Sequence, residues 1–256
     1  MKITILGCGW SSGVPIVGCT CPVCLSGKPR NRRRRASILI EDGGRRVLVD
    51  TSPDLRAQLL DARVNTIDGV VYTHGHADHL HGIDDLRPLN YHMKRSIPAF
   101  GTQETLNEIR SRFGYACRAP DAAAPWLAPS LDLKLIEPGL AFAVGGFEFS
   151  GFEQGHGPLT TLGLRFRSAA YSTDVKELSE TAFEALRGVE LWIVDCAGIV
   201  PHPTHSHLSQ TLGWIERVAP KRAVLTHMAH RLDYDELLTM CPAGVEPAYD
   251  GMVLEL

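Results

Sequence analysis

Histidine and aspartate gather in one short segment, Thr73–His79, which reads Thr-His-Gly-His-Ala-Asp-His. Imidazole nitrogens and carboxylate oxygens are the groups that bind zinc, manganese and iron in proteins. The segment follows the apolar run Val70–Tyr72 and contains a glycine, so its spacing suits a loop that leaves a strand better than one face of a helix. Four ligands at one strand end can hold two metal ions. The candidate ligands are His74, His76, Asp78 and His79.

Three more polar residues stand where later apolar runs end. They are His156, Asp174 and His227. Functional sites on α/β scaffolds gather at the ends of strands. We therefore expect these residues to join the first four in a centre that holds two metal ions.

The elements that must position these residues follow from the apolar patterning. The chain has 256 residues, of which 44% are hydrophobic, so it can bury a sizeable core, and we expect one α/β domain over residues 1–256. The predicted strands are Lys2–Leu6, Ser37–Glu41, Arg46–Asp50, Ile67–Tyr72, Leu131–Ile136, Phe147–Phe152, Leu162–Phe166, Ala169–Ser172, Leu191–Val194 and Arg222–Thr226. The predicted helices are Asp54–Ala62, Thr102–Phe113, Leu178–Leu186, Ser209–Val218 and Asp233–Met240.

Charge and cysteine content limit the partners. A formal net charge of -3 does not indicate a nucleic-acid or membrane partner. No apolar run approaches the roughly 18 residues of a membrane-spanning helix. Met1–Gly7 reads as a first strand rather than a signal peptide. Seven cysteines without an export signal favour a metal site or free thiols over disulfides. We therefore expect a cytoplasmic protein.

Three of the cysteines form a Cys-x-Cys-x-x-Cys cluster at Cys19, Cys21 and Cys24. Thiolates at this spacing can surround one ion, and a structural zinc takes a fourth ligand. His230, three residues after His227, is the candidate for that position. The alternative is a set of buried free thiols.

The histidine and aspartate pattern resembles the metallo-β-lactamase superfamily of hydrolases, whose His-x-His-x-Asp-His motif stands here as His74, His76, Asp78 and His79. The downstream ligands of that family match His156, Asp174 and His227. The resemblance implies an αββα four-layer sandwich. It also implies how the two metal ions are held: one by His74, His76 and His156, the other by Asp78, His79 and His227, with Asp174 bridging both.

The chemistry of such a centre is hydrolysis. Two ions roughly 3.5–4 Å apart share a hydroxide, because the pKa of their bound water falls toward 7. The hydroxide attacks carbon or phosphorus, and Asp78 and Asp174 offset the charge of the ions, which we expect to be zinc or manganese. Asp50 either orients a ligand histidine or begins a helix.

The cysteine cluster narrows the resemblance to the cyclic phosphodiesterase family of bacterial phosphonate degradation, which opens phosphoribosyl 1,2-cyclic phosphate, and to the related tRNA 3′-processing endonucleases. This likeness implies two catalytic metal ions, one structural zinc, a small cyclic or nucleotide-like phosphodiester as substrate, and a possible homodimer. The family also places a non-ligand histidine beside the phosphate. His205 fits that role, and His207 is the alternative.

Other interpretations remain open on this sequence. A lactonase or thioester hydrolase would use the same scaffold, and a redox sensor would use the cysteines. We expect no stable nucleic-acid partner, because Ala116–Pro129 is too short to be the arm with which the endonucleases grip tRNA. The basic run Arg30–Arg35 is typical of a solvated face, and Arg35 is the first candidate if one arginine contacts the substrate.

Overall fold

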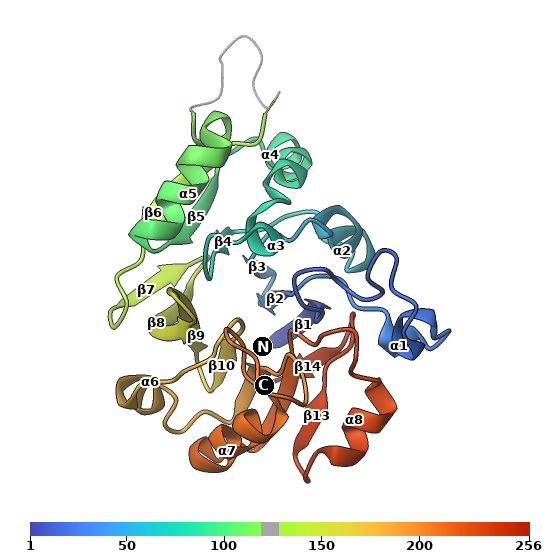
Figure 1. Ribbon diagram of the computed structural model, residues 1–256. Helices are drawn as coiled ribbons and strands as arrows, with labels where there is room; N and C mark the ends of the chain where they lie inside the picture. The colour runs from blue at the N-terminus through green and yellow to red at the C-terminus, as the bar shows by residue number, and fades with distance from the viewer. Residues whose placement is uncertain (119–127) are drawn as a thin grey trace.

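A computed structural model describes residues 1–118 and 128–256 of the chain. Two mixed β-sheets face each other, and helices cover their outer sides (Figure 1). The strands of the first sheet, in spatial order, are β14 (Val253–Glu255), β1 (Lys2–Gly7), β2 (Ser37–Asp42), β3 (Arg45–Val49), β4 (Gly69–Val71), β5 (Ile97–Gly101) and β6 (Leu131–Leu135).

The second sheet is built from the C-terminal half of the chain. Its strands, in spatial order, are β13 (Val245–Pro247), β12 (Arg222–Thr226), β11 (Leu191–Asp195), β10 (Ala169–Ser172), β9 (Leu159–Phe166), β8 (Phe147–His156) and β7 (Ala141–Val144). Its β10, β11 and β12 run parallel. Their carboxyl ends therefore meet at one edge, where the metal ligands were expected.

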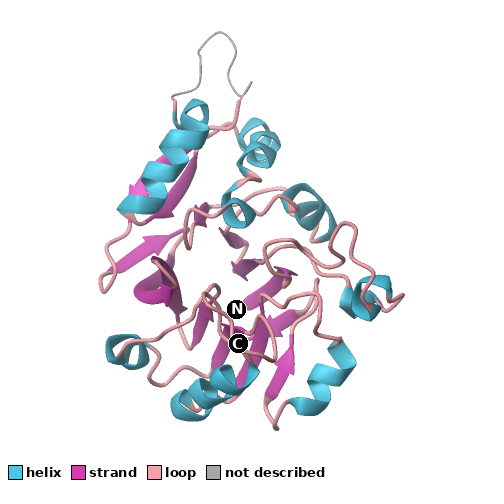
Figure 2. Cartoon of the chain, viewed as in Figure 1, coloured by secondary structure: helices cyan, strands magenta, loops and turns pink. Residues whose placement is uncertain are grey.

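Helices lie on both outer faces, as the colouring by secondary structure shows (Figure 2). The α-helices are α1 (Pro22–Leu25), α2 (Leu55–Asp61), α3 (Ala77–Leu80), α4 (Arg87–Met93), α5 (Gln103–Phe113), α6 (Glu180–Ala185), α7 (Leu208–Val218) and α8 (Tyr234–Met240). Short 3₁₀ turns stand at η1 (Pro29–Asn31), η2 (Ile83–Leu86) and η3 (Gly114–Cys117).

The period-two alternation of the strands explains the layers. In β2, Ile38 and Ile40 point into the core between the two sheets, whereas Leu39 joins the core beneath the helices. In β3, Val47 likewise faces the other sheet and Leu48 faces the helices. Both faces of the first sheet are therefore apolar and buried, and the expected αββα four-layer sandwich is confirmed.

Most helices and strands predicted from the sequence begin and end within two or three residues of the observed bounds. The hairpin of β2 and β3 turns at Gly43 and Gly44, whose positive φ values of 55° and 82° suit glycine. Thr102 caps α5 with its side chain. The sequence did not reveal β5, β7, β13 and β14, each five residues or shorter.

Two expectations concern the rest of the chain. The predicted loop Ala116–Pro129 contains residues 119–127, which lie outside the described residues, and Gly114–Cys117 is a 3₁₀ turn. Across the two described stretches, no helix combines the length and the apolar character needed to cross a membrane.

Candidate metal centre

The loop after β4 carries the first four candidate ligands. His76 is the residue before α3, and the single turn of that helix carries Asp78 and His79 into the interior, where both are buried. Gly75 lies against α5, and a Cβ added there would stand 2.9 Å from Cγ of Glu108. Glycine therefore lets the loop and the helix approach closely.

Three other chain segments, which carry His156, Asp174 and His227, converge on this loop. Two groups of side chains have ligand atoms within 4.8 Å of one another, and Asp174 belongs to both. The first group is His74, His76, His156 and Asp174, and the second is Asp78, His79, Asp174 and His227. The structure thus brings together all seven histidine and aspartate residues that the sequence singled out.

Asp174 presents one carboxylate oxygen to each group. Its Oδ1 lies 3.9 Å from Nε2 of His74 and 3.8 Å from Nε2 of His156. Its Oδ2 lies 3.1 Å from Nε2 of His79 and 3.4 Å from Nε2 of His227. This is the arrangement that a carboxylate needs to bridge two ions.

The backbone is left-handed at three positions around the centre. Asp50, Asp174 and His227 have φ values of 63°, 53° and 56°. Each such conformation costs a non-glycine residue on the order of 1 kcal/mol or more, and such strain clusters at functional sites. Each of the three follows a strand, so the strain turns the side chain into the site as the strand ends.

Buried polar atoms test whether these residues fit a metal. Within the described part of the chain, five buried atoms of the seven candidate ligands lack a hydrogen-bond partner: Nε2 of His74, Nε2 of His79, both ring nitrogens of His227, and Oδ2 of Asp78. Leaving such an atom unpaired costs roughly 1–3 kcal/mol. A divalent cation takes imidazole nitrogen and carboxylate oxygen as ligands, so this donor set fits a metal.

Burial and mutual charge set the pKa values in the centre. Burial alone would raise the pKa of Asp174, but His227, His79 and His74 outweigh it and hold that pKa well below its usual value. Burial alone would lower the pKa of His79, but Asp174 and the neighbouring carboxylates raise it well above the usual value. The site therefore keeps its carboxylates ionised and attracts positive charge.

Asp50 orients the metal loop, the segment Thr73–His79 that carries the first four candidate ligands. Its Oδ2 lies 2.7 Å from Nδ1 of His79, and its two oxygens accept hydrogen bonds from the backbone N–H and the hydroxyl of Thr73, both at 2.8 Å. The side chain is fully buried. Of the two interpretations of Asp50, the contact with His79 favours orientation of a histidine, because α2 begins after Asp54.

His205, not His207, reaches the centre. The ring of His205 lies 4.6 Å from that of His156 and 4.8 Å from that of His227, measured between centroids. His207 stands at the N-cap of α7. Nδ1 of His205 pairs with Oδ2 of Asp195 at 2.9 Å. Sequence reasoning missed Asp195, although this carboxylate ends an apolar strand just as Asp174 follows one.

The cysteine cluster forms a separate candidate site. Sγ of Cys19, Sγ of Cys21 and a ring nitrogen of His230 lie within 4.8 Å of one another. Cys24 stands outside that group, although its thiol interacts with the thiols of Cys19 and Cys21. Nδ1 of His230 is buried and has no hydrogen-bond partner among the residues described. These atoms suit a zinc ion, whose fourth ligand stays a prediction.

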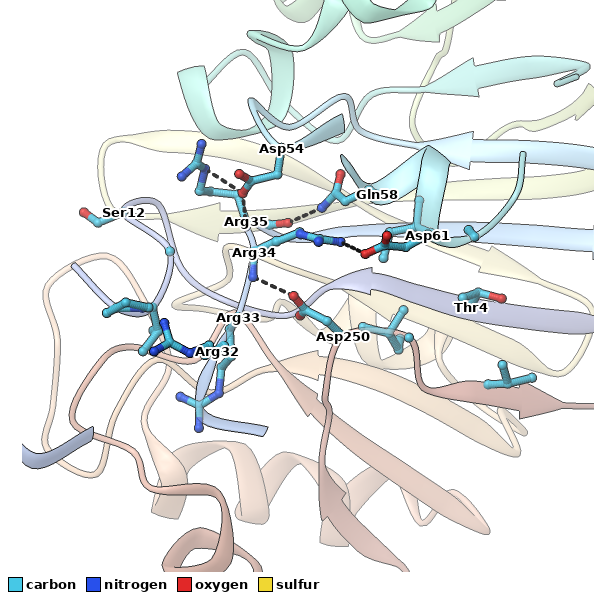
Figure 3. A pocket seen from close by; sticks show the side chains of 18 of the residues that line it. Thr4, Ser12, Arg32, Arg33, Arg34, Arg35, Asp54, Gln58, Asp61 and Asp250 are labelled. Atoms are coloured by element: carbon cyan, nitrogen blue, oxygen red, sulfur yellow. Dashed lines mark hydrogen bonds and ion pairs between the residues drawn. The ribbon is translucent and has the colours of Figure 1, made fainter. Parts of the chain in front are cut away.

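The interpretation of the basic run as a solvated face is wrong for its second half. Arg33 is 2% exposed and donates to the backbone carbonyls of Ala229 and Leu232. Figure 3 shows the next two arginines turned toward carboxylates: Arg34 pairs with Asp61 at 2.7 Å, and Arg35 pairs with Asp54 at 3.0 Å. They line a cavity of about 720 Å³ that none of the candidate metal ligands lines.

Comparison with known proteins identifies relatives of this arrangement. A family model described as the β-lactamase superfamily domain matches residues 45–228. The crystal structure of a diphosphatase from the PhnP family is 36% identical, covers 100% of this chain and 97% of its own, and superposes with a TM-score of 0.92.

Two curated relatives are longer proteins. An octanoyltransferase of Porphyromonas gingivalis is 34% identical over 98% of this chain and 51% of its own length. A ribonuclease Z of a Bradyrhizobium species is 28% identical over 56% of this chain and 47% of its own length. The chain therefore spans about half the length of these curated relatives.

Proposed function

Because the chain belongs to the β-lactamase superfamily, we propose that it is a metal-dependent hydrolase that cleaves small cyclic or nucleotide-like phosphodiesters. The observation that carries this proposal is the Asp195–His205 pair beside the seven candidate metal ligands. A thioester needs little help at its leaving group, because a thiolate departs without a proton. A phosphodiester with a sugar leaving group does need it, because an alkoxide leaves poorly without a proton.

The residues of the centre would hold two divalent ions, zinc or manganese. When bound, such ions neutralise charge that develops on the phosphoryl oxygens and lower the pKa of water at the site. Asp174 would bridge the ions, and Asp50 would hold His79 in place through its Nδ1. We also propose one structural zinc at the cysteine cluster of Cys19, Cys21, Cys24 and His230.

His205 would act on the leaving oxygen. Its Nδ1 is engaged by Asp195, so Nε2 is the nitrogen available to a substrate. The carboxylate of Asp195 is fully buried and holds the ring in this orientation. His205 can therefore hold a proton on Nε2 and give it to the departing oxygen of the sugar.

The relatives support a substrate that contains phosphate. One is named a diphosphatase and another a ribonuclease Z, and both names denote enzymes that act on phosphate linkages. The diphosphatase shares the whole length of this chain at 36% identity.

A second candidate function is hydrolysis of an acyl thioester. The observation in its favour is the 34% identity to an octanoyltransferase over 98% of this chain. The pairing of Asp195 with His205 ranks it below the phosphodiesterase, because a thiolate leaves without a proton donor.

A substrate panel tests the proposal. Protein loaded with zinc or manganese would be assayed with bis-p-nitrophenyl phosphate, 2′,3′-cyclic AMP, an octanoyl thioester and a lactone. We expect turnover of both phosphodiesters at rates well above those of the two carbonyl substrates. Turnover of the thioester or the lactone alone would overturn the phosphodiesterase and leave the metal centre standing.

A further inference from the structure

A third histidine of the loop before α7 stands beside the site with no role in the proposed mechanism. The ring of His202 lies 5.2 Å from that of His205, measured between centroids. His205 in turn packs against His156 and His227. His202 is therefore one ring farther from the centre than His205, and it is only partly buried.

Hydrogen bonding fixes which nitrogen of His202 carries the proton. The backbone N–H of Thr204 donates to Nδ1 of His202 at 3.3 Å. An Nδ1 that accepts a hydrogen bond leaves the proton of the neutral ring on Nε2. Burial and the neighbouring His205 lower the pKa of His202, which favours that neutral ring. Over residues 1–118 and 128–256, Nε2 of His202 has no hydrogen-bond partner.

Thr204 also fixes the position of His202 relative to the centre. Its backbone carbonyl lies 2.7 Å from Nδ1 of His156, a candidate metal ligand. Gly157, with a φ of 64°, allows this approach, because a Cβ there would stand 2.7 Å from Cγ2 of Thr204. Thr204 thus contacts both rings and fixes the position of His202 relative to His156.

The two neighbouring histidines offer different groups to a ligand. Asp195 engages Nδ1 of His205, so Nε2 of His205 is the nitrogen that exchanges a proton with the substrate. His202 offers a fixed, neutral Nε2–H donor next to it. We propose that His202 binds an oxygen of the sugar attached to the scissile phosphate, and thereby favours ribose phosphodiesters over aryl phosphodiesters.

The order of the rings argues for a sugar oxygen rather than a phosphate oxygen. The scissile phosphate belongs at the buried ligands, and His205, 8% exposed, is the next group outward. His202 lies beyond it at the more exposed edge, where the substituent of the phosphate would lie. A ribose offers hydroxyl and ring oxygens there, whereas a nitrophenyl ring has no acceptor near its ester oxygen.

Two substitutions separate hydrogen bonding from packing, and the inference rests on the proposed function. His202→Phe keeps a ring against His205 and removes the donor, whereas His202→Gln places an amide N–H near the position of Nε2. For 2′,3′-cyclic AMP, we expect His202→Phe to raise KM about three- to tenfold with little change in kcat, the effect of one neutral hydrogen bond. His202→Gln should have a KM close to that of wild type. Both variants should match wild type on bis-p-nitrophenyl phosphate.

A binding measurement and a control complete the test. In a calorimetric titration, which involves no turnover, His202→Phe should bind 3′-AMP more weakly than wild type and His202→Gln do. His92→Phe, an exposed histidine on α4, should change nothing. Three results would each overturn the inference. The first is that His202→Phe loses activity equally on both substrates, and the second is that its KM for 2′,3′-cyclic AMP is unchanged. The third is that His202→Gln is as impaired as His202→Phe. Wild-type protein that hydrolyses neither phosphodiester would instead overturn the proposed function, and the role of His202 with it.

Discussion

Oδ2 of Asp195 lies 2.9 Å from Nδ1 of His205 and accepts the backbone N–H of Val175 at 3.1 Å. Asp195 is fully buried at the end of β11, and His205 belongs to the loop before α7. The carboxylate therefore has one orientation, and it fixes the ring so that Nε2 is left for chemistry. In the proposed function, this pair favours a phosphodiester with a sugar leaving group over a thioester, whose thiolate departs without a proton.

Asp195→Asn should impair catalysis without loss of metal. The amide can present an N–H to Nδ1 of His205, which favours the wrong tautomer of the ring. For 2′,3′-cyclic AMP we expect kcat to fall on the order of 10²-fold, the lower range for a positioned general acid. Elemental analysis should show wild-type metal content. An unchanged kcat would mean that His205 needs no orientation.

His205→Ala should discriminate between leaving groups. Its effect on 2′,3′-cyclic AMP should be about 10²–10⁴-fold in kcat, because the sugar oxygen needs a proton. The kcat for bis-p-nitrophenyl phosphate should fall much less, because nitrophenolate departs without help. Equal losses on the two substrates would assign His205 to phosphate binding. An active His205→Ala with an inactive His207→Ala would show that the wrong histidine was chosen.

The clustering of the seven histidine and aspartate residues was predictable from sequence, because each stands at or after the end of an apolar strand, and strand ends meet in this fold. Asp195 obeys the same rule, yet nothing local distinguishes it from a capping carboxylate until His205 is placed beside it. Arg33 could not be predicted as buried, because the carbonyls that it binds belong to Ala229 and Leu232, almost 200 residues away. Long-range pairing of this kind has no local signature.

Short elements escaped prediction for a related reason. The turn of α3 is four residues long and has no apolar period of its own. It forms because Thr51 binds the backbone of His79 and because Asp50 fixes the ring of that residue. Tertiary contacts, rather than helix propensity, therefore build the part of the metal loop that carries Asp78 and His79.

Cys21→Ser should destabilise the protein. A structural zinc contributes folding free energy directly, so removal of one thiolate should lower the melting temperature by several degrees. Cys241→Ser is the matched control, since Cys241 is also a free, half-buried cysteine, and it lies outside the cluster. Equal melting temperatures for Cys21→Ser and the control would argue against a structural zinc.

Asp250 should make stability fall as pH rises. Burial raises the pKa of Asp250 from 3.8 to about 6, although it accepts the backbone N–H groups of Arg34 and Cys8. Between pH 4 and pH 6 the folded state then binds more protons than the unfolded state, so this residue's contribution to stability is lost as pH rises through that window.

Asp250→Asn should therefore change the pH dependence of unfolding. Relative to wild type, its melting temperature should rise as pH goes from 4 to 7, by about 2–4 °C for each 1 kcal/mol gained. The difference between the two proteins removes the effect of groups that titrate in both, such as Asp233. A difference in melting temperature that does not vary with pH would contradict the raised pKa.

Metal reconstitution is the most direct test of the central claim. Chelator-treated wild type and Asp174→Ala would be titrated with zinc or manganese while hydrolysis of bis-p-nitrophenyl phosphate is followed. We expect no turnover by metal-free wild type, recovery that reaches a plateau once two ions occupy the histidine and aspartate centre, and no recovery by folded Asp174→Ala. Full phosphodiester turnover by metal-free wild type, or by Asp174→Ala, would contradict the account.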